Sequence, residues 1–420
     1  MEVKLKFPPL QIDEKKYKKH KVNIRDTQIK KLPKKIVYCK TCVIPNQRPR
    51  TDFDSEGVCS ACRYAEKKFH GGIDWNAREN ELMKLLDRHR SKDGSYDCIV
   101  PSSGGKDSSI VAHQLKAKYN MHPLMITWAP FIYSDIGWQN YYNIIHSGFS
   151  GLVAWPNGYL HRKLARVAFE LKGDAFEPFV YGQKAFAFHV ALRFKIPLIF
   201  YGENGEVEYG GSMKNANKPY ESVKDWEELY FKGSGIDTLV KEGQKMGILS
   251  HEELKENNFE FYKAPPISEI KKLKVQMHWW SYYKLWVPQE NFYYASRNTG
   301  FESNPARTDG TYTKAFSIDD RLDPYHYYLA LIKFGYGRAS REASSDIRCG
   351  HITREEAVAL VKRYDQEFPK TYFKDFLAYL DIPEKHFWKV IDRYRRTRIW
   401  KKVKGTWKLR HTAAMSGTDD

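Results

Sequence analysis

The stretch from Asp97 to Leu115 constrains the fold of this chain more strongly than any other part. Residues 97–100 form a short, largely apolar run typical of a buried strand, and residues 110–115 have the apolar spacing of a helix. Between them, residues 101–109 read Pro-Ser-Ser-Gly-Gly-Lys-Asp-Ser-Ser. Glycines let backbone N–H groups approach an anion closely, and the helix dipole favours negative charge at this end. The order of strand, loop and helix therefore predicts an anion site.

The chain continues with alternating strands and helices. We expect strands at 123–128, 151–155 and 196–201, and helices ending near Asn120 and covering 160–171 and 184–194. This alternation indicates an α/β fold with a mainly parallel, doubly wound sheet, whose ligands bind beyond the carboxyl ends of the strands. The loop does not have the Walker A spacing of kinases and GTPases, which argues against those classes.

The cysteines predict a metal site. Four of the six form two CxxC pairs, Cys39 with Cys42 and Cys59 with Cys62, separated by sixteen residues. Two such turns can close a tetrahedral four-thiolate site, and four protein ligands leave no open position, so we expect structural Zn²⁺. We expect the lone Cys98 to be a small core residue and the lone Cys349 to be structural.

The chain shows neither an apolar leader nor an apolar run near the ~20 residues that span a bilayer, so we expect a soluble, cytoplasmic protein. The net charge of +18 is concentrated at two ends. Residues 1–36 carry twelve basic residues against four acids, and residues 385–411 carry eleven against one. Such ends are typically solvated and partly flexible, or dock a protein partner; an anionic membrane or RNA is the alternative.

Polar residues follow the expected strand at 196–201. Glu203, Asn204, Glu206 and Glu208 lie within six positions of one another, and oxygen ligands of this kind suit Mg²⁺ or the polar groups of a substrate. A solvated acidic turn is the alternative. Upstream, Gln183 ends another short apolar run and is expected to reach the same cleft.

Residues 211–330 interrupt the alternation and are rich in aromatics, which we interpret as an insertion that shapes a substrate pocket. Each aromatic taken singly is more often a core residue. Arg307 or Arg321 could pair with a substrate carboxylate or phosphate. Beyond the insertion, glycines beside Lys333 and Arg338 suggest a segment that closes over a triphosphate. Residues 353–364 have the capping pattern of an amphipathic helix.

The run Ser-Gly-Gly-Lys-Asp-Ser at 103–108 resembles the SGGxDS loop of the PP-loop ATP pyrophosphatases. Members of that superfamily cleave ATP between the α and β phosphates and adenylate an oxygen of the substrate. The resemblance implies that the loop holds pyrophosphate and that Asp107 places Mg²⁺. The expected nucleotide-binding residues are Ser102, Ser103, Gly104, Gly105, Lys106, Asp107, Ser108, Thr127, Lys333 and Arg338.

A narrower resemblance covers about residues 36–370. The paired CxxC turns, PSSGGKDSS, YGQ, IFYGENGEVEYG, FSIDD, KFGYGRAS and HITREEAV are together similar to the N-acetyl sugar amidotransferases of bacterial surface-polysaccharide (lipopolysaccharide O-antigen) and nonulosonic-acid pathways. The resemblance implies conversion of an acetamido group into an acetamidino group on a nucleotide-linked or free acidic sugar, with ATP cleaved to AMP. The expected catalytic residues are Lys106, Asp107 and Glu203. The expected substrate-binding residues are Gln183, Asn204, Glu206, Glu208, Arg307, Asp319 and Asp320.

Ammonia must come from elsewhere, because neither the N-terminus nor Cys349 has the context of a glutaminase nucleophile. The resemblance implies partner subunits of the glutaminase and cyclase type found in histidine biosynthesis. Two alternatives stay open. One is a PP-loop tRNA thiolation enzyme, which would use the basic ends to hold RNA; the other is a zinc-ribbon nucleic-acid binder with a vestigial ATP loop.

The 420 residues, 42% of them hydrophobic, suffice for a large core and for two or three domains. The expected organisation is a basic arm at 1–36, a four-cysteine module at 37–70, a PP-loop domain at 71–345 with an insertion at about 211–330, and a helical, basic region at 346–420.

Overall fold

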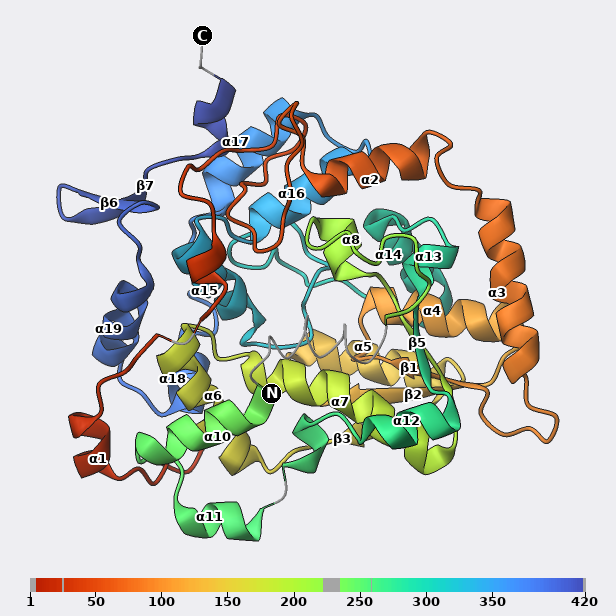
Figure 1. Ribbon diagram of the computed structural model, residues 1–420, viewed down its shortest axis with the longest axis horizontal. Coiled ribbons are helices and arrows are strands. Elements are labelled where there is room, and N and C mark those ends of the chain that lie inside the picture. Colours follow the sequence, from red (N-terminus) through yellow and green to blue (C-terminus); the bar gives the residue numbers. More distant parts are fainter. Residues whose placement is uncertain (1–4, 25, 222–234, 258, 418–420) are drawn as a thin grey trace.

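A five-stranded parallel sheet lies at the centre of the structure, a computed structural model that describes residues 5–24, 26–221, 235–257 and 259–417 (Figure 1). Part of the expected arm and residues 222–234 of the expected insertion lie outside the described residues. All four strand pairings are parallel, and the strand order is β3-β2-β1-β4-β5. The strands are β1 (Cys98–Pro101), β2 (Pro123–Trp128), β3 (Ser150–Ala154), β4 (Leu198–Tyr201) and β5 (Gln276–Trp279).

The strand order reverses between β1 and β4. From β1 the chain passes through α4 (Lys106–Ala117) to β2 and through α5 (Asp135–His146) to β3, whereas β4 pairs with the other edge of β1. Loops that leave β1 and β4 therefore diverge and open a crevice at the carboxyl ends of the strands. The phosphate-loop residues and the Glu203 segment both lie at this position.

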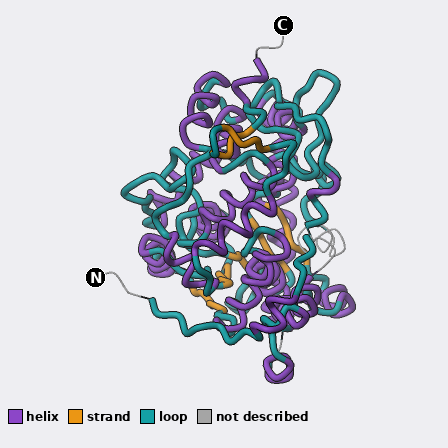
Figure 2. The backbone as a smooth tube through the Cα atoms, turned by 90° about the vertical axis from the view of Figure 1, so that its left-hand side faces the viewer, coloured by secondary structure: helices purple, strands orange, loops and turns teal. Residues whose placement is uncertain are grey.

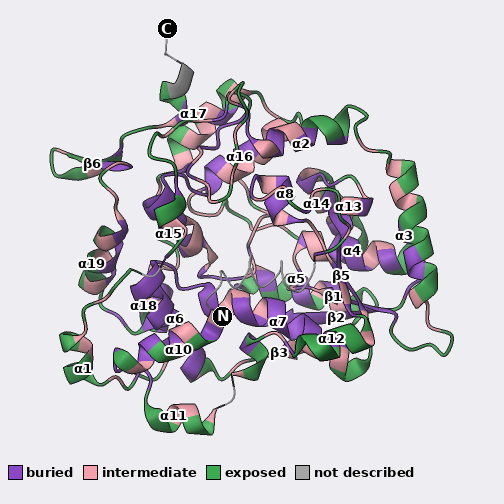
Figure 3. Ribbon diagram, in the orientation of Figure 1, coloured by how far each residue is buried: buried purple, intermediate pink, exposed green. Residues whose placement is uncertain are grey.

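Helices cover both faces of the sheet, which explains why its strands are continuous apolar runs. One face packs on α6 (Gly158–Lys172), α7 (Glu177–Phe194), α10 (Gly235–Lys245) and α12 (Ile267–Leu273). The other packs on α3 (Trp75–His89), α4, α5 and α13 (Trp280–Tyr283), and Figure 3 shows the sheet as largely buried. Further elements are α11 (His251–Glu256), α14 (Pro288–Thr299), η1 (Ile29–Lys31) and η2 (Glu260–Tyr262).

Two elements inside this fold extend what the sequence indicated: a helix that begins earlier than residue 184 and a fifth strand. The run that ends at Gln183 belongs to α7, which begins at Glu177; its Gly182 packs so closely on Trp128 that a Cβ would lie 2.2 Å from the indole. The expected insertion also contains β5, which completes the central sheet. This strand is only four residues long and continues directly into α13, so its sequence lacks a turn that would mark its end.

The C-terminal region is mainly helical and has its own core, in which Phe169 of α6 packs against Phe376 and Phe387. Its helices are α15 (Asp323–Phe334), α16 (Arg338–Arg348), α17 (Arg354–Tyr364), α18 (Phe373–Leu380) and α19 (Glu384–Tyr394). The predicted capping box of Thr353 and Glu356 is present at α17. The expected helical tail instead contains an antiparallel hairpin, β6 (Trp400–Val403) with β7 (Thr406–Leu409), followed by η3 (Ala413–Gly417) (Figure 2).

The described parts of the two basic ends contact the body of the protein through particular side chains, while their lysines are exposed, as a solvated face requires. The buried carboxylate of Glu170 in α6 accepts hydrogen bonds from Tyr17 of α1 (Glu14–Lys19), from His386 and from Arg393. Arg396 donates to the Ile29 carbonyl at 2.9 Å. The two ends therefore lie against each other and against α6. Among the described residues, no helix combines the length and apolar character needed to cross a membrane.

Candidate active site

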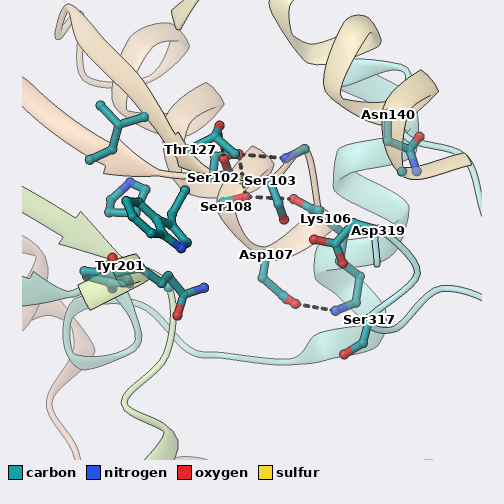
Figure 4. Close-up of a pocket in the computed structure, with 18 of the residues that line it drawn as sticks. Ser102, Ser103, Lys106, Asp107, Ser108, Thr127, Asn140, Tyr201, Ser317 and Asp319 are labelled. Atoms are coloured by element: carbon teal, nitrogen blue, oxygen red, sulfur yellow. Dashed lines mark hydrogen bonds and ion pairs between the residues drawn. The ribbon is translucent and has the colours of Figure 1, made fainter. Parts of the chain in front are cut away.

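A cavity of about 370 Å³ lies at the carboxyl ends of β1 and β4 (Figure 4). Its polar walls include the phosphate loop after β1, the segment after β4, and the loop that carries Ser317 and Asp319. Residues of β2, α5 and α7 also line it. In Figure 4 the side chains of these segments face one another across the cavity. The anion site that the sequence predicts beside β1 therefore opens into an enclosed space.

The phosphate loop depends on Gly104 for two reasons. Its φ is +87°, which side-chain-bearing residues rarely adopt, and a Cβ would lie 2.6 Å from the backbone of Tyr141 in α5. The loop is stabilised by the Ser102 hydroxyl, which accepts from the Gly104 N–H at 3.1 Å and lies 2.8 Å from the Ser108 hydroxyl. No side chain caps the helix N-terminus at Gly105, so the backbone N–H groups of the first turn of α4 remain available to an anion.

Lys106 and Asp107 form an ion pair at the start of α4, with 2.5 Å between Nζ and Oδ2. Lys106 is buried, and its ammonium lies 3.9 Å from the centroid of the Phe316 ring. Asp107 also accepts a hydrogen bond from the Asn291 amide at 3.2 Å. These contacts hold a positive and a negative charge in defined positions beside the loop.

Glu203 and Lys184 have strongly shifted pKa values. Burial, and after it the charge of Asp107, raise the pKa of Glu203 to about 7. Burial lowers the pKa of Lys184 to about 8, although Glu203 and Glu221 oppose that shift. The Lys184 ammonium lies 4.0 Å from the centroid of the Tyr201 ring. Both groups therefore titrate near neutral pH within one cavity.

Sequence analysis missed Lys184. It follows Gln183 in α7 and lines the same cavity. Lys184 is a lysine among Phe, Ala and Val residues of a largely buried helix, and this unusual setting could have indicated it. A lysine in such surroundings is usually paired or functional.

Asp319 and Asp320 are adjacent in sequence, but their side chains lie in different surroundings. Asp319 lines the cavity, and burial raises the pKa of its carboxyl while a hydrogen bond from Ser103 opposes the shift. The Asp320 carboxylate instead accepts from the backbone N–H groups of Phe131 and Leu322, at 2.7 and 2.8 Å. Asp320 therefore holds the loop that presents Asp319.

The structure brings most of the predicted nucleotide-binding residues together. The expected site residues that line this cavity are Ser102, Ser103, Gly104, Gly105, Lys106, Asp107, Ser108, Thr127, Gln183, Glu203 and Asp319. Asn204 lies just behind them, where its side chain caps α8 (Gly205–Tyr209) by accepting from Glu206 N–H at 3.1 Å.

Other predicted residues do not line this cavity and are engaged elsewhere. Glu208 forms a buried ion pair with Lys68 of α2 (Ser60–Phe69), with 2.7 Å between the charged atoms. Arg307 pairs with Glu367, and Arg321 bridges Asp135 and Asp375. Among the triphosphate candidates, Lys333 pairs with Asp26 at 3.0 Å and Arg338 pairs with Glu342 at 2.8 Å. Except for the i,i+4 pair of Arg338 and Glu342 within α16, these pairings join segments distant in sequence, so local patterns could not indicate them.

A second cavity, of about 490 Å³, adjoins the first. Both cavities are lined by Asp107, Glu203, Gly205 and Ser317, so these four residues mark the junction. The remaining walls come from the cysteine module, α8, α15 and α16. Glu206 and Lys333, which the sequence analysis assigned to substrate and nucleotide respectively, line this second space.

The four cysteines of the CxxC pairs converge as predicted. All are buried, and their Sγ atoms lie within 4.8 Å of one another. The distances of 3.9 Å between Cys39 and Cys62 and 3.7 Å between Cys42 and Cys59 fit the edge of a tetrahedron of thiolates around Zn²⁺, about 3.8 Å for Zn–S bonds of about 2.3 Å. The Arg348 guanidinium, 4.0 Å from Cys42 Sγ, offsets part of the negative charge of such a site.

The family comparison concerns the C-terminal part of the chain. Residues 297–413 match the family model described as "LPS biosynthesis protein WbpG-like, C-terminal domain". This match supports a family of polysaccharide biosynthesis and is consistent with a sugar-modifying biosynthetic enzyme. The matched range includes α15 and α16, which form one wall of the second cavity. The chain matches no curated protein.

Proposed function

We propose that this protein is a PP-loop ATP pyrophosphatase that transfers ammonia to the acetamido group of an N-acetylated, acidic sugar of a surface-polysaccharide pathway. One observation carries the proposal: the cavity at the strand-order reversal, which contains the phosphate loop, shares Asp107 and Glu203 with a second cavity of similar size. Two substrates could therefore meet at these two carboxylates. The match of residues 297–413 supports the sugar as one of them.

The first cavity suits ATP. Its phosphates are expected at the loop of residues 102–108, where the uncapped N–H groups at the start of α4 and the charge of Lys106 oppose their negative charge. The interior of the cavity is lined by Trp128, Phe186 and Tyr201, whose aromatic faces suit a nucleoside.

Asp107 is suited to hold Mg²⁺ beside Glu203. Two carboxylates at one junction repel each other, as the raised pKa of Glu203 reflects, and a divalent cation would relieve that repulsion. When bound, Mg²⁺ would supply charge neutralisation for the pyrophosphate leaving group. Lys106 is placed to stabilise the same charge.

The proposed reaction needs no protein nucleophile. The acetamide oxygen attacks the α-phosphorus of ATP, the bond to the β-phosphate oxygen breaks, and pyrophosphate leaves. The acetamide loses its N–H proton and becomes an imidate adenylate. Ammonia then adds to the imidate carbon, and AMP leaves with the former acetamide oxygen. The products are an acetamidino sugar, AMP and pyrophosphate.

Glu203 is the proposed general base at the junction. With a pKa of about 7 it is ionised in part at neutral pH and can accept the proton that ammonia loses on addition. The ammonia would come from the expected partner subunits, a glutaminase and a cyclase-like protein. The proposed role of the four-cysteine site is structural, since Zn²⁺ there would have no open position.

The positions of the lone cysteines favour this reaction over thiolation. Cys98 is buried within β1, and Cys349 caps the C-terminus of α16. Neither lines the first cavity. Sulfur transfer through a protein persulfide would need a thiolate beside the phosphate loop.

Isotope transfer tests the proposed chemistry directly. The purified chain would be incubated with ATP, Mg²⁺, ammonium and UDP-N-acetylglucosaminuronic acid carrying heavy oxygen in its acetamide group. Mass spectrometry should find the heavy oxygen in AMP and a sugar lighter by the exchange of oxygen for NH. AMP formed without the label would exclude attack by the acetamide oxygen, and sulfur transfer to tRNA would establish the alternative.

A further inference from the structure

The second cavity contains two arginines whose side chains retain unused hydrogen-bonding capacity. Arg48, of the cysteine module, and Arg341, of α16, both line it. The Nε atoms of both side chains are buried and have no hydrogen-bond partner. A buried guanidinium N–H without an acceptor is costly, so each of these side chains retains a donor that the protein does not satisfy. Both side chains also line the cavity, where their other N–H groups can meet a ligand.

Arg341 is held in place by aromatic rings. Its guanidinium carbon lies 4.9 Å from the ring centroid of Tyr327 and 5.2 Å from that of Tyr336. Among the described residues, no carboxylate forms an ion pair with it. Aromatic faces fix the position of a guanidinium without using its N–H groups, which therefore remain available for a bidentate contact.

Most acidic residues of the cavity wall have hydrogen-bonding partners of their own. Asp107 pairs with Lys106, and burial keeps Glu203 protonated in part at neutral pH. Glu206 accepts two hydrogen bonds from Arg50, and Asp174 pairs with His326 at 3.0 Å. Glu342 accepts from Arg338 at 2.8 Å. Asp346 accepts from the hydroxyl of Tyr312. Arg48 donates to the Gly205 carbonyl at 3.3 Å, and its charge, after that of Arg50, helps to lower the pKa of Glu206 against the effect of burial. The charge of Arg341 is thus available to a molecule inside the cavity, with Arg48 as a second cation in the wall.

We propose that Arg341, with Arg48 as a second cation in the cavity wall, binds an anionic group of the acceptor in the second cavity. This inference rests on the proposed function in taking the occupant to be the acceptor. The anion is a carboxylate of the sugar or a phosphate of a linked nucleotide, since both match the guanidinium fork. The contact would orient the acceptor so that its acetamide lies at the junction with the first cavity, and it replaces the earlier assignment of Arg307 or Arg321.

The position of the site explains why the cysteine module and the C-terminal helices are joined. Ile44 and the four cysteines pack in one apolar core with Ala330, Phe334 and Tyr336. This core supports Arg48 on one side and the ring that holds Arg341 on the other. The anion would therefore be bound between two parts of the chain that lie about 300 residues apart in sequence.

Binding measurements with three probes test the inference without requiring turnover. The probes are N-acetylneuraminic acid, which has a carboxylate, UDP-N-acetylglucosamine, which has phosphates, and UDP-N-acetylglucosaminuronic acid, which has both. For Arg341→Met we expect binding at least about tenfold weaker than in the wild type for the probes that carry the recognised group. Loss with the first and third probes identifies the carboxylate, and loss with the second and third identifies the phosphate.

Matched variants separate the proposed contact from a structural effect. Arg341→Lys keeps the positive charge but not the planar guanidinium, so it should lose part of the probe binding. Arg48→Met should weaken the binding of the same probes. Arg363→Met removes an exposed arginine outside both cavities and should change nothing. All variants should bind α,β-methylene-ATP like the wild type, which shows that the first cavity is intact.

Equal binding by wild type and Arg341→Met, or no binding of any probe to the wild type, would overturn the inference. The proposed function fails independently, because it requires AMP formation. If Arg341→Met weakens probe binding but no N-acetylated probe supports AMP formation, the result supports the anion site and rejects the amidotransferase assignment.

Discussion

Asp107 and Glu203 face each other at the junction of the two cavities, and the charge of Asp107 adds to burial in raising the pKa of Glu203 to about 7. The folded protein therefore keeps a proton that an unfolded glutamate, with a usual pKa of 4.5, would release. The stability that this proton contributes is complete below pH 4.5 and is lost as the pH rises through 7.

Glu203→Gln should consequently stabilise the protein at alkaline pH. Glutamine imitates the protonated side chain, so the variant should gain about 2 kcal/mol over the wild type at pH 8 and nothing at pH 4. Urea unfolding in EDTA at both pH values measures this. Adding Mg²⁺ should narrow the gap at pH 8, and equal stability of the two proteins there would contradict the raised pKa.

Lys184→Met should move the pH dependence of activity. The Lys184 charge favours the ionised form of Glu203, so its removal raises the pKa of Glu203 further. If Glu203 is the general base, the rate rises with pH through its pKa, and this rise should move to higher pH in the variant. The test is to measure kcat/KM for AMP formation against pH in the wild type and in the variant. If both proteins give the same pH profile, Glu203 is not that base.

Lys106→Met should lower kcat/KM for ATP by about 100-fold or more, because it removes the buried charge placed beside the phosphate loop. Lys116→Met, at the exposed end of the same helix, is the matched control and should retain activity. Pyrophosphate release measures both variants. Full conversion of ATP to AMP by Lys106→Met would refute the phosphate-loop assignment.

Cys39→Ser should lose the metal, whereas Cys349→Ser should keep it. Elemental analysis is expected to find about one zinc per chain in the wild type and in Cys349→Ser. Metal loss should lower stability, because metal binding contributes folding energy. Metal loss should also weaken the binding of UDP-N-acetylglucosaminuronic acid more than the binding of α,β-methylene-ATP, since the cysteine module borders the second cavity. A zinc-free Cys39→Ser protein of wild-type stability would argue against a structural metal site.

Glu170→Gln should lower the free energy of unfolding by about 3 kcal/mol, because it breaks a buried network that joins both basic ends to α6. Burial alone would raise the pKa of Glu170, but His386, Tyr17 and Arg166 lower it to about 2. Its contribution is therefore present above pH 4.5 and lost as the pH falls through 2. Glu355→Gln, on the exposed first turn of α17, should change stability little. Unfolding at pH 7 compares the variants, and equal values would show that the network is not stabilising.

Local patterns predicted the parts of the site that are local. The phosphate loop, the two CxxC turns, the box at Thr353 and four of the five strands each depend on residues a few positions apart. The strand β5 was missed because it is four residues long and continues directly into α13. Its place in the sheet comes from pairing with β4, across 74 intervening residues, and no local spacing reports such pairing.

The charged residues also show what local sequence can and cannot predict. Lys333 and Arg338 beside glycines suggested a phosphate clamp, yet Lys333 pairs with Asp26 and Arg338 with Glu342 and Asp323. Arg341, which no motif singled out, lines a cavity and forms no ion pair with a carboxylate among the described residues. Short-range sequence order specifies which backbone can form an anion loop or a thiolate turn. Whether a charge is neutralised or free for a ligand depends on which distant segments fold against it, because electrostatic pairing acts through space and not along the chain.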